Sequence, residues 1–251
     1  MEKKLKKPLK IALLGYGKMG KEIEKLAVEA GHEILFVIDN ENDWEQKGND
    51  LYKADVAIDF SLPKTVTQNI EKCFAAKVPV VVGTTGWYSD FERIRKICKH
   101  ENQSLFYATN FSLGVNIFSA INNKLAEIMN RFSEYEPKII ETHHTQKLDA
   151  PSGTAISLAE GILNKLDRKT SWKLDENNQI FQSNILPIKA LRIENVPGTH
   201  EIMYQSSVDE IRIIHEAKNR KGFAKGAILS AEWIYDKKGV FTMSDLLALV
   251  L

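Results

Sequence analysis

The apolar positions in the first 110 residues alternate between short continuous runs and helically spaced stripes. Runs such as Lys10–Leu14 and Pro79–Val82 are almost entirely apolar, which is typical of strands buried on both faces of a parallel sheet. Between these runs, apolar residues recur at the spacing of amphipathic helices. The expected strands are 10–14, 34–38, 56–60, 79–82 and 105–108, and the expected helices are 18–30, 65–76 and 90–99. This alternation predicts an α/β fold with a doubly wound parallel sheet.

The pattern changes after residue 111. A long helical stripe is followed by a strand, a second helix, a polar stretch and then three strands in succession. These elements are expected at 112–131, 138–144, 154–166, 167–183 (a loop, or a loop with a short strand), 185–194, 200–206 and 210–217. Successive strands without helices between them indicate a mixed or antiparallel sheet, and therefore a second, smaller α+β domain. A helix at 223–235 and a strand at 240–243 follow, so we expect one domain from 1–111 and 218–251 and another from 112–217.

A glycine-rich turn of the form G-x-G-x-x-G joins the first expected strand to the first expected helix. Its residues are Gly15, Tyr16, Gly17, Lys18, Met19 and Gly20. The first glycine permits the tight turn, the second lets backbone N–H groups approach a pyrophosphate, and the third lets the helix pack closely on the strand. The phosphates would lie at the positive end of the helix. The turn predicts a Rossmann-type dinucleotide site, with a purely structural glycine turn as the alternative.

Three further segments lie at the ends of expected strands, where open parallel sheets bind their ligands. Asp39 ends the second strand and would accept hydrogen bonds from the adenine ribose, which favours NAD over NADP because a 2′-phosphate would be repelled. Two small or polar segments follow later strands and suit the nicotinamide half of a cofactor, although each could be an ordinary turn. Their candidate residues are Gly83, Thr84 and Thr85, and Ala108, Thr109, Asn110 and Phe111.

The densest group of candidate catalytic residues lies at 141–155. His143, His144 and Lys147 precede a helix that Asp149 or Ser152 would cap. The free backbone N–H groups at the start of that helix, from Ser152, Gly153 and Thr154, would then form a cradle for a carboxylate beside cationic side chains. Histidine is the side chain best suited to exchange protons near neutral pH, and lysine can donate a proton or anchor a carboxylate.

Two other interpretations of this segment remain open. Adjacent histidines on a strand point to opposite faces, so one of them could be a core residue and the lysine a solvated loop residue. The second interpretation is a zinc site. No HExxH or CxxC pattern supports it, and we expect no metal.

The same segment resembles the E-x-H-H-x-x-K-x-D-A-P-S-G-T-A signature of the dihydrodipicolinate reductase (4-hydroxy-tetrahydrodipicolinate reductase) family. Other parts of the chain resemble this family as well, namely 15–20, 58–61, 83–86, 109–116 and 215–233. The resemblance implies a two-domain reductase of lysine and diaminopimelate biosynthesis. It reduces 4-hydroxy-tetrahydrodipicolinate to tetrahydrodipicolinate with loss of water. The N-terminal domain and the C-terminal helix would bind NAD(P)H, and the middle domain would bind a cyclic dicarboxylate and form a homotetramer through its sheets.

The resemblance also implies a role for individual residues. His143 would be the proton donor or acceptor, Lys147 a proton donor, and His144, Gly153 and Thr154 substrate contacts. The glycine turn, Asp39 and the segments 83–85 and 108–111 would contact the cofactor. Many members have arginine at the position of Lys18 and a basic residue at that of Asn40, so these departures favour NADH or dual use. Arg220 would contact either the cofactor or an acidic partner.

Composition narrows the alternatives. The 34 basic and 33 acidic residues give a net charge of +1, which argues against a nucleic-acid partner. No segment approaches the roughly 20 apolar residues of a membrane span, so we expect no membrane partner and a cytoplasmic location. A related semialdehyde dehydrogenase would need a cysteine nucleophile, whereas Cys73 and Cys98 lie on apolar helix stripes. A dinucleotide-sensing protein without turnover would need no histidine–lysine loop.

Overall fold

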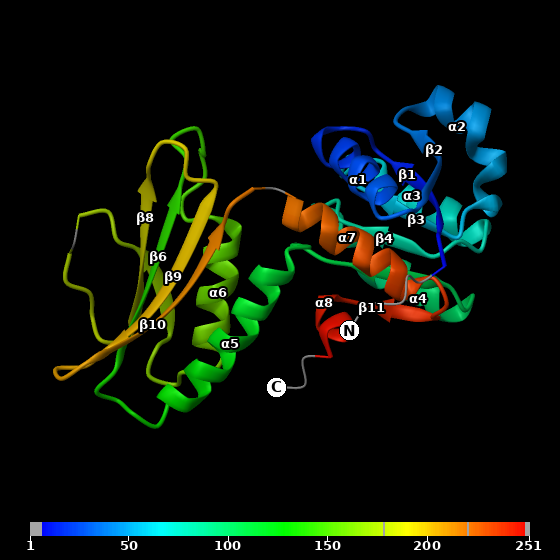
Figure 1. The fold of residues 1–251 in the computed structure, drawn as a ribbon. Helices are drawn as coiled ribbons and strands as arrows, with labels where there is room; N and C mark the ends of the chain where they lie inside the picture. Colours follow the sequence, from blue (N-terminus) through cyan, green and yellow to red (C-terminus); the bar gives the residue numbers. More distant parts are fainter. Residues whose placement is uncertain (1–6, 178, 220, 249–251) are drawn as a thin grey trace. The chain divides into compact units, whose positions relative to one another are not determined.

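The computed structural model describes residues 7–177, 179–219 and 221–248 (Figure 1). The chain forms two compact units, each described here by itself. The first runs up to Leu113 and resumes at Lys221, and the second begins at Gly114 and occupies the interval between them. Arg220 lies outside the described residues.

The first unit is built on a six-stranded sheet in the order β11-β5-β4-β3-β1-β2, in which all neighbouring strands are parallel. Its strands are β1 (Lys10–Leu14), β2 (Glu33–Ile38), β3 (Val56–Asp59), β4 (Val80–Val82), β5 (Ser104–Tyr107) and β11 (Gly239–Phe241). Its helices are α1 (Lys18–Glu29), α2 (Glu41–Lys47), α3 (Val66–Ala75), α4 (Phe91–His100), α7 (Lys221–Ile234) and α8 (Met243–Leu247), with short 3-10 helices at Gly48–Lys53 and Tyr88–Asp90. Helices α1 and α7 pack in one apolar cluster and α3 and α4 in another, so the predicted doubly wound Rossmann-type sheet is confirmed.

Strand β1 shows why these runs are continuously apolar. Ile11 and Leu13 belong to the cluster with α1 and α7, whereas Ala12 and Leu14 belong to the cluster with α3 and α4. Successive side chains point to opposite faces, and here both faces are covered by helices. A polar side chain at any of these positions would therefore be buried without a partner.

The second unit contains a five-stranded mixed sheet in the order β10-β9-β6-β8-β7. Its elements are α5 (Leu113–Met129), β6 (Glu136–His143), α6 (Gly153–Leu163), β7 (Ser171–Leu174), β8 (Ile185–Arg192), β9 (Gly198–Gln205) and β10 (Glu210–Ala217). Strand β6 is antiparallel to β9 and parallel to β8. Helices α5 and α6 pack on one face of this sheet through a third apolar cluster (Figure 1). The predicted mixed sheet is confirmed.

Some elements differ from the sequence expectations. The helix expected at 154–166 ends at Leu163, and the strand expected at 240–243 ends at Phe241 because α8 begins at Met243. Helix α2 was not predicted, because it buries none of its residues and therefore carries no apolar stripe. Within the described ranges, no helix has both the length and the hydropathy to cross a membrane.

Candidate active site

Strand register assembles a polar cluster on the helix-covered face of the second sheet. Along β6, Glu141 and His143 both lie on the buried face, because side chains of a strand alternate. His200 of β9 stands directly opposite Glu141, and Arg192 of β8 pairs with His143. Strands far apart in the sequence therefore place a carboxylate, two imidazoles and a guanidinium together.

Glu141 is the centre of this cluster and is fully buried. Its Oε1 accepts hydrogen bonds from the backbone N–H of Ser152 at 3.1 Å and from Nη2 of Arg192 at 3.3 Å, and its Oε2 lies 3.3 Å from Nδ1 of His143. Burial by itself would raise the pKa of Glu141, but the close approach of the His143 ring and hydrogen bonds from Ser152 outweigh it and lower the pKa to about 2. Glu141 is therefore a carboxylate at neutral pH.

The start of α6 lies against the same cluster. Ser152 caps the helix as predicted, since its Oγ accepts the backbone N–H of Ala155 at 3.2 Å. The expectation of a free N–H at Ser152 is wrong, because that group donates to Glu141. The next two N–H groups, of Gly153 and Thr154, have no partner within the helix by geometry. A side chain on Gly153 would meet no atom within 4 Å, so this end of the helix faces open space.

His200 and Arg192 are members of the cluster that the sequence analysis missed. Burial, and after it the proximity of His143, lowers the pKa of His200 to about 4, so its ring is neutral at pH 7. Its Nε2 lies 3.2 Å from the hydroxyl of Ser152, and its ring meets that of His143 edge-on with 5.2 Å between centroids. His200 could have been identified as a member of the cluster only from the register in which β6 pairs with β9, and a single sequence does not give this register.

The loop that follows β6 carries the other predicted residues. His143 is the last residue of the strand and is buried, whereas the neighbouring His144 is half-buried. Nζ of Lys147 contacts both carboxylate oxygens of Asp149 at 2.7 and 2.8 Å, a pairing that also lowers the pKa of Asp149. The loop therefore holds one buried imidazole and one partly exposed ammonium group close together in the chain.

The residues around the cluster of Glu141, His143 and His200 argue against a metal ion at this place. Glu141, His143 and His200 offer ligand atoms that all lie within 4.8 Å of one another. The same carboxylate, however, already binds the guanidinium of Arg192, a permanent positive charge that disfavours a second cation. The arrangement suits an acid–base group better than a metal centre.

In the first unit, two glycines of the turn at 15–20 stand where a side chain would clash with the backbone. Gly15 has φ +91°, and a Cβ on it would lie 2.4 Å from the carbonyl oxygen of Phe60. A Cβ on Gly20 would lie 2.3 Å from the carbonyl oxygen of Gly15, so helix and strand meet at backbone distance. Gly17 differs, because a Cβ there would meet nothing within 4 Å. The turn therefore presents open space at the N-terminus of α1, which fits the pyrophosphate of a dinucleotide.

The side chains around the turn divide into exposed and internal ones. Asp39 is exposed, and its Oδ1 accepts the backbone N–H of Tyr16 at 2.6 Å. Lys18 is exposed, whereas Met19 packs against the apolar cluster of α1 and α7. Asp39 and Lys18 are thus two charged side chains that a ligand at this turn would meet.

The predicted segments after β4 and β5 are fixed from inside the fold. Thr84 is buried and its hydroxyl donates to the carboxylate of Asp59 at 2.6 Å, whereas Thr85 is exposed. Phe111 is also buried, with its ring 5.6 Å from that of Phe60. A ligand at these segments would therefore meet the backbone of Thr84 and the side chain of Thr85. The remaining predicted residues are the half-buried Gly83 and Asn110, the buried Ala108 and the exposed Thr109.

Asp59 holds this edge of the sheet together. Its carboxylate accepts hydrogen bonds from Thr84, from Nδ2 of Asn69 at 2.8 Å and from the hydroxyl of Ser61 at 2.8 Å. Burial raises the pKa of Asp59, while these hydrogen bonds oppose the shift. The loops that follow β3 and β4 are consequently tied to one buried carboxyl group.

The cysteines are not nucleophiles. Cys73 and Cys98 are both buried and free, as their helical positions predicted. Burial raises the pKa of Cys98 to about 11 and that of Cys73 further still, so neither is a thiolate at neutral pH. This removes the chemistry that a semialdehyde dehydrogenase would require.

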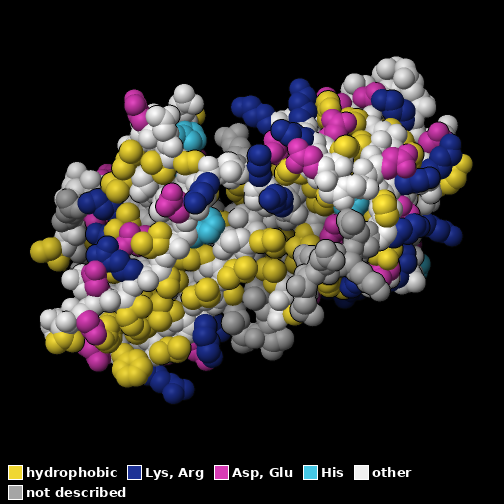
Figure 2. Space-filling model, in the orientation of Figure 1, with side chains coloured by type: hydrophobic (Ala, Val, Ile, Leu, Met, Phe, Trp, Pro, Cys, Tyr) yellow, Lys and Arg dark blue, Asp and Glu magenta, His cyan; other side chains and the backbone are white. Residues whose placement is uncertain are grey.

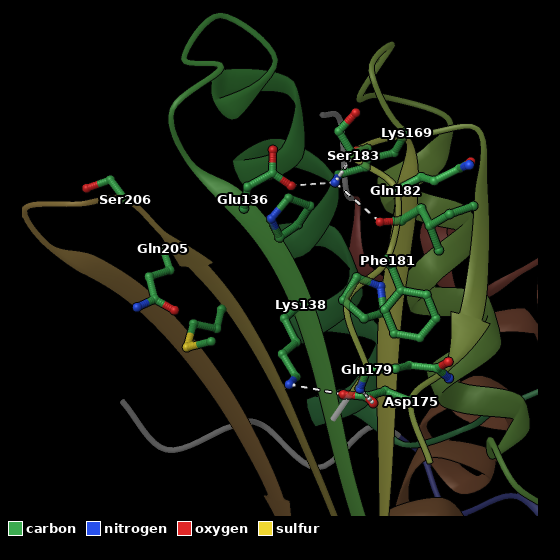
Figure 3. A pocket seen from close by; sticks show the side chains of 14 residues that line it. Glu136, Lys138, Lys169, Asp175, Gln179, Phe181, Gln182, Ser183, Gln205 and Ser206 are labelled. Atoms are coloured by element: carbon green, nitrogen blue, oxygen red, sulfur yellow. Dashed lines mark hydrogen bonds and ion pairs between the residues drawn. The ribbon is translucent and has the colours of Figure 1, made fainter. Parts of the chain in front are cut away.

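A pocket of about 420 Å³ lies on the other side of the second sheet, but its charges are satisfied internally (Figure 3). Nζ of Lys169 contacts the carboxylate of Glu136 and the carbonyl oxygen of Ser183, and Lys138 contacts Asp175 at 3.4 Å. Lys138 and His143 differ by an odd number of positions along β6 and so point to opposite faces. The pocket is therefore separate from the histidine cluster.

A parallel sheet with a glycine turn after its first strand, followed in the chain by an α+β unit, is an architecture typical of Rossmann-type oxidoreductases, a class that uses a nicotinamide cofactor. The chain belongs to the dihydrodipicolinate reductase family. Family models described as the N-terminus and the C-terminus of dihydrodipicolinate reductase match residues 9–111 and 114–247.

Individual relatives agree with this assignment. The chain is 49% identical over 240 residues to the 4-hydroxy-tetrahydrodipicolinate reductase of Christiangramia forsetii, covering 96% of this chain and 98% of the relative. It is 34% identical over 233 residues to the enzyme of the same name from Rickettsia bellii, covering 91% and 90%. The dipicolinate-bound dihydrodipicolinate reductase of Paenisporosarcina sp. TG-14 has the same fold, with a TM-score of 0.72 at 22% identity over 94% of this chain and 97% of that one.

Proposed function

We propose that the chain reduces 4-hydroxy-tetrahydrodipicolinate with NADH or NADPH, giving tetrahydrodipicolinate, water and the oxidised cofactor, in lysine and diaminopimelate biosynthesis. The observation that carries this proposal is the short segment 143–154. It joins a buried imidazole, a partly exposed ammonium group and the open N-terminus of α6. The curated relatives that carry this name support the same substrate.

The residues of this segment divide the chemistry between them. The N–H groups of Gly153 and Thr154, with Ser152 capping the helix and His144 as a further contact, bind a substrate carboxylate. Loss of the 4-hydroxyl group with a neighbouring ring proton, as water, conjugates ring carbon 4 with the C=N bond, and a nicotinamide bound at the glycine turn would supply a hydride to that carbon. Negative charge then develops towards the ring nitrogen, where His143 and Lys147 stabilise it and supply the proton.

The test is cofactor oxidation, followed optically, with substrate made freshly from pyruvate and aspartate semialdehyde by the condensing enzyme. Rapid oxidation that requires the condensation product is the expected result. Binding of NADH without oxidation would instead favour a dinucleotide sensor. Because the reaction consumes cytoplasmic NAD(P)H, the cytoplasm is the location that fits this function.

Cofactor preference is the first specific prediction. The exposed carboxylate of Asp39 disfavours a 2′-phosphate, so the wild type is expected to use NADH, or both cofactors. Asp39→Asn keeps an oxygen that can accept the N–H of Tyr16 but removes the charge. The ratio of kcat/KM for NADPH over NADH should rise by about 10-fold, as expected for loss of one nearby like charge. Asp50→Asn, at an exposed acid paired with Lys53, should leave the ratio unchanged, and an unchanged ratio in Asp39→Asn would contradict the ribose assignment.

A second prediction concerns the oligomeric state. A homotetramer formed through the sheets fits the face of the second sheet opposite α5 and α6, where Ile214 is 58% exposed and shares a row with Glu201 and Ile140. Ile214→Lys should convert the tetramer into smaller species, because the interface would bury a charge in place of an apolar side chain. Light scattering after size exclusion measures this.

A matched control exists on the opposite side of the same unit. Hydrophobic side chains gather over α5 on the face drawn in Figure 2. Ile121 of α5 is 49% exposed. Ile121→Lys should leave the tetramer intact. Dissociation by the α5 substitution rather than by the one on β10 would place the interface on the helices instead.

A further inference from the structure

Two buried polar atoms face each other in the histidine cluster, and neither has a hydrogen bond of good geometry to any described residue. They are Oε2 of Glu141 and Nδ1 of His143, which lie 3.3 Å apart. A small rotation of the ring would align them. A buried carboxylate oxygen and a buried ring nitrogen left unpaired would each be costly, so each is the natural partner of the other.

The other donors around Glu141 are already committed. Ser152 N–H and the Arg192 guanidinium both bind Oε1, not Oε2. His200 lies 3.9 Å from Oε2, but its Nε2 is closer to the hydroxyl of Ser152, at 3.2 Å. That hydroxyl oxygen accepts the N–H of Ala155, and the ring nitrogen nearest to Oε2 is Nδ1 of His143, at 3.3 Å. His143 therefore provides the proton for Oε2.

We propose that Glu141 is a positioning residue that holds His143 in the tautomer protonated at Nδ1, leaving Nε2 as the ring atom that exchanges protons with substrate. The catalytic part of this statement rests on the proposed function. A carboxylate fixed by a backbone N–H and a guanidinium cannot rotate away, so it sets both the orientation of the ring and the nitrogen that carries the proton.

Gly198 supports the assignment from the other side of the ring. A Cβ on Gly198 would lie 3.0 Å from Nε2 of His143. A side chain at this position would therefore press on the nitrogen that the proposal leaves open. The absence of a side chain keeps Nε2 uncovered while Glu141 holds Nδ1.

Glu141→Gln tests the proposal with little change of shape. If the amide oxygen accepts from Ser152 and Arg192 as Oε1 does, the amide nitrogen faces Nδ1 and donates to it, which reverses the tautomer. The ring nitrogens of His143 are read by ¹⁵N NMR of the whole protein, with the signals assigned by comparison with His143→Asn. Glu134→Gln, at an exposed turn position before β6, is the control.

The expected wild-type spectrum has the proton on Nδ1, and Glu141→Gln should move it to Nε2. We expect kcat to fall by at least about 10-fold while KM for NADH stays unchanged, because the substitution alters only a group that acts in proton transfer. A wild-type proton on Nε2 would overturn the proposal even if the variant failed to fold, as would an unchanged tautomer in a folded variant. A failure of the proposed function would show separately, as a wild type that does not oxidise NADH with the substrate.

Discussion

Replacing His143 with alanine is expected to lower kcat by about 10²–10⁴-fold, the usual contribution of a positioned proton donor or acceptor. The side chain lies at the end of β6, beside the buried carboxylate of Glu141 and in the same short segment as Lys147. The affinity for NADH should not change, because the glycine turn belongs to the other unit. Steady-state kinetics with both substrates varied, together with NADH titration by fluorescence, separates the two effects.

The control for this variant is His100→Ala, at an exposed histidine in the last turn of α4. It should retain full turnover. Loss of His143 also removes the ring that lies 3.3 Å from Oε2 of the buried Glu141, so thermal unfolding must be measured alongside activity. A folded His143→Ala enzyme with wild-type kcat would remove the histidine from the mechanism and make the loop a structural element.

The parallel sheet was predictable because its central strands β1, β3, β4 and β5 are buried between two helical layers. Burial of that kind leaves a continuous apolar run in the sequence, as at Ala12 to Leu14, and it needs no knowledge of which strands are neighbours. Helix α8, by contrast, was not predicted. It is short and begins with a capping box between Thr242 and Asp245, a local signal that the search for apolar stripes overlooked.

The candidate site was predictable only where it is local in the chain. His143, Lys147 and the cap at Ser152 belong to one segment, and the residue types alone indicate proton transfer beside an anion site. The partners that fix His143 come from other strands. His200 reaches Glu141 through antiparallel pairing, and Arg192 through parallel pairing, and neither register can be derived from one sequence.

The prediction that the N–H group of Ser152 is free for a ligand was also wrong because of tertiary structure. The sequence places it correctly at the start of α6, but a buried carboxylate from β6 occupies it. The protein thus uses part of its own helix N-terminus to hold Glu141 and leaves the following N–H groups for a ligand. A cap residue can be recognised from sequence, whereas competition for the free N–H groups depends on tertiary structure.

Alanine substitution at two glycines of the turn after β1 should have different effects, one on NADH binding and the other on stability. Gly17→Ala should fold normally, because its φ of −73° is ordinary for alanine and its Cβ would meet nothing within 4 Å. The same methyl group would project into the space where the pyrophosphate approaches the N-terminus of α1. Loss of one or two charge-assisted hydrogen bonds there should weaken NADH binding by about 10²-fold.

Gly15→Ala should instead damage the fold. Its φ of +91° and a Cβ 2.4 Å from the Phe60 carbonyl oxygen force the turn away from the β3 end, at a cost of about 3 kcal/mol in the free energy of unfolding. Denaturant unfolding and NADH titration of both variants distinguish the outcomes. Normal NADH affinity in a folded Gly17→Ala protein would mean that the pyrophosphate does not lie at this turn. The open space at Gly17 would then have to serve another purpose, since the two neighbouring glycines already satisfy the packing of strand and helix.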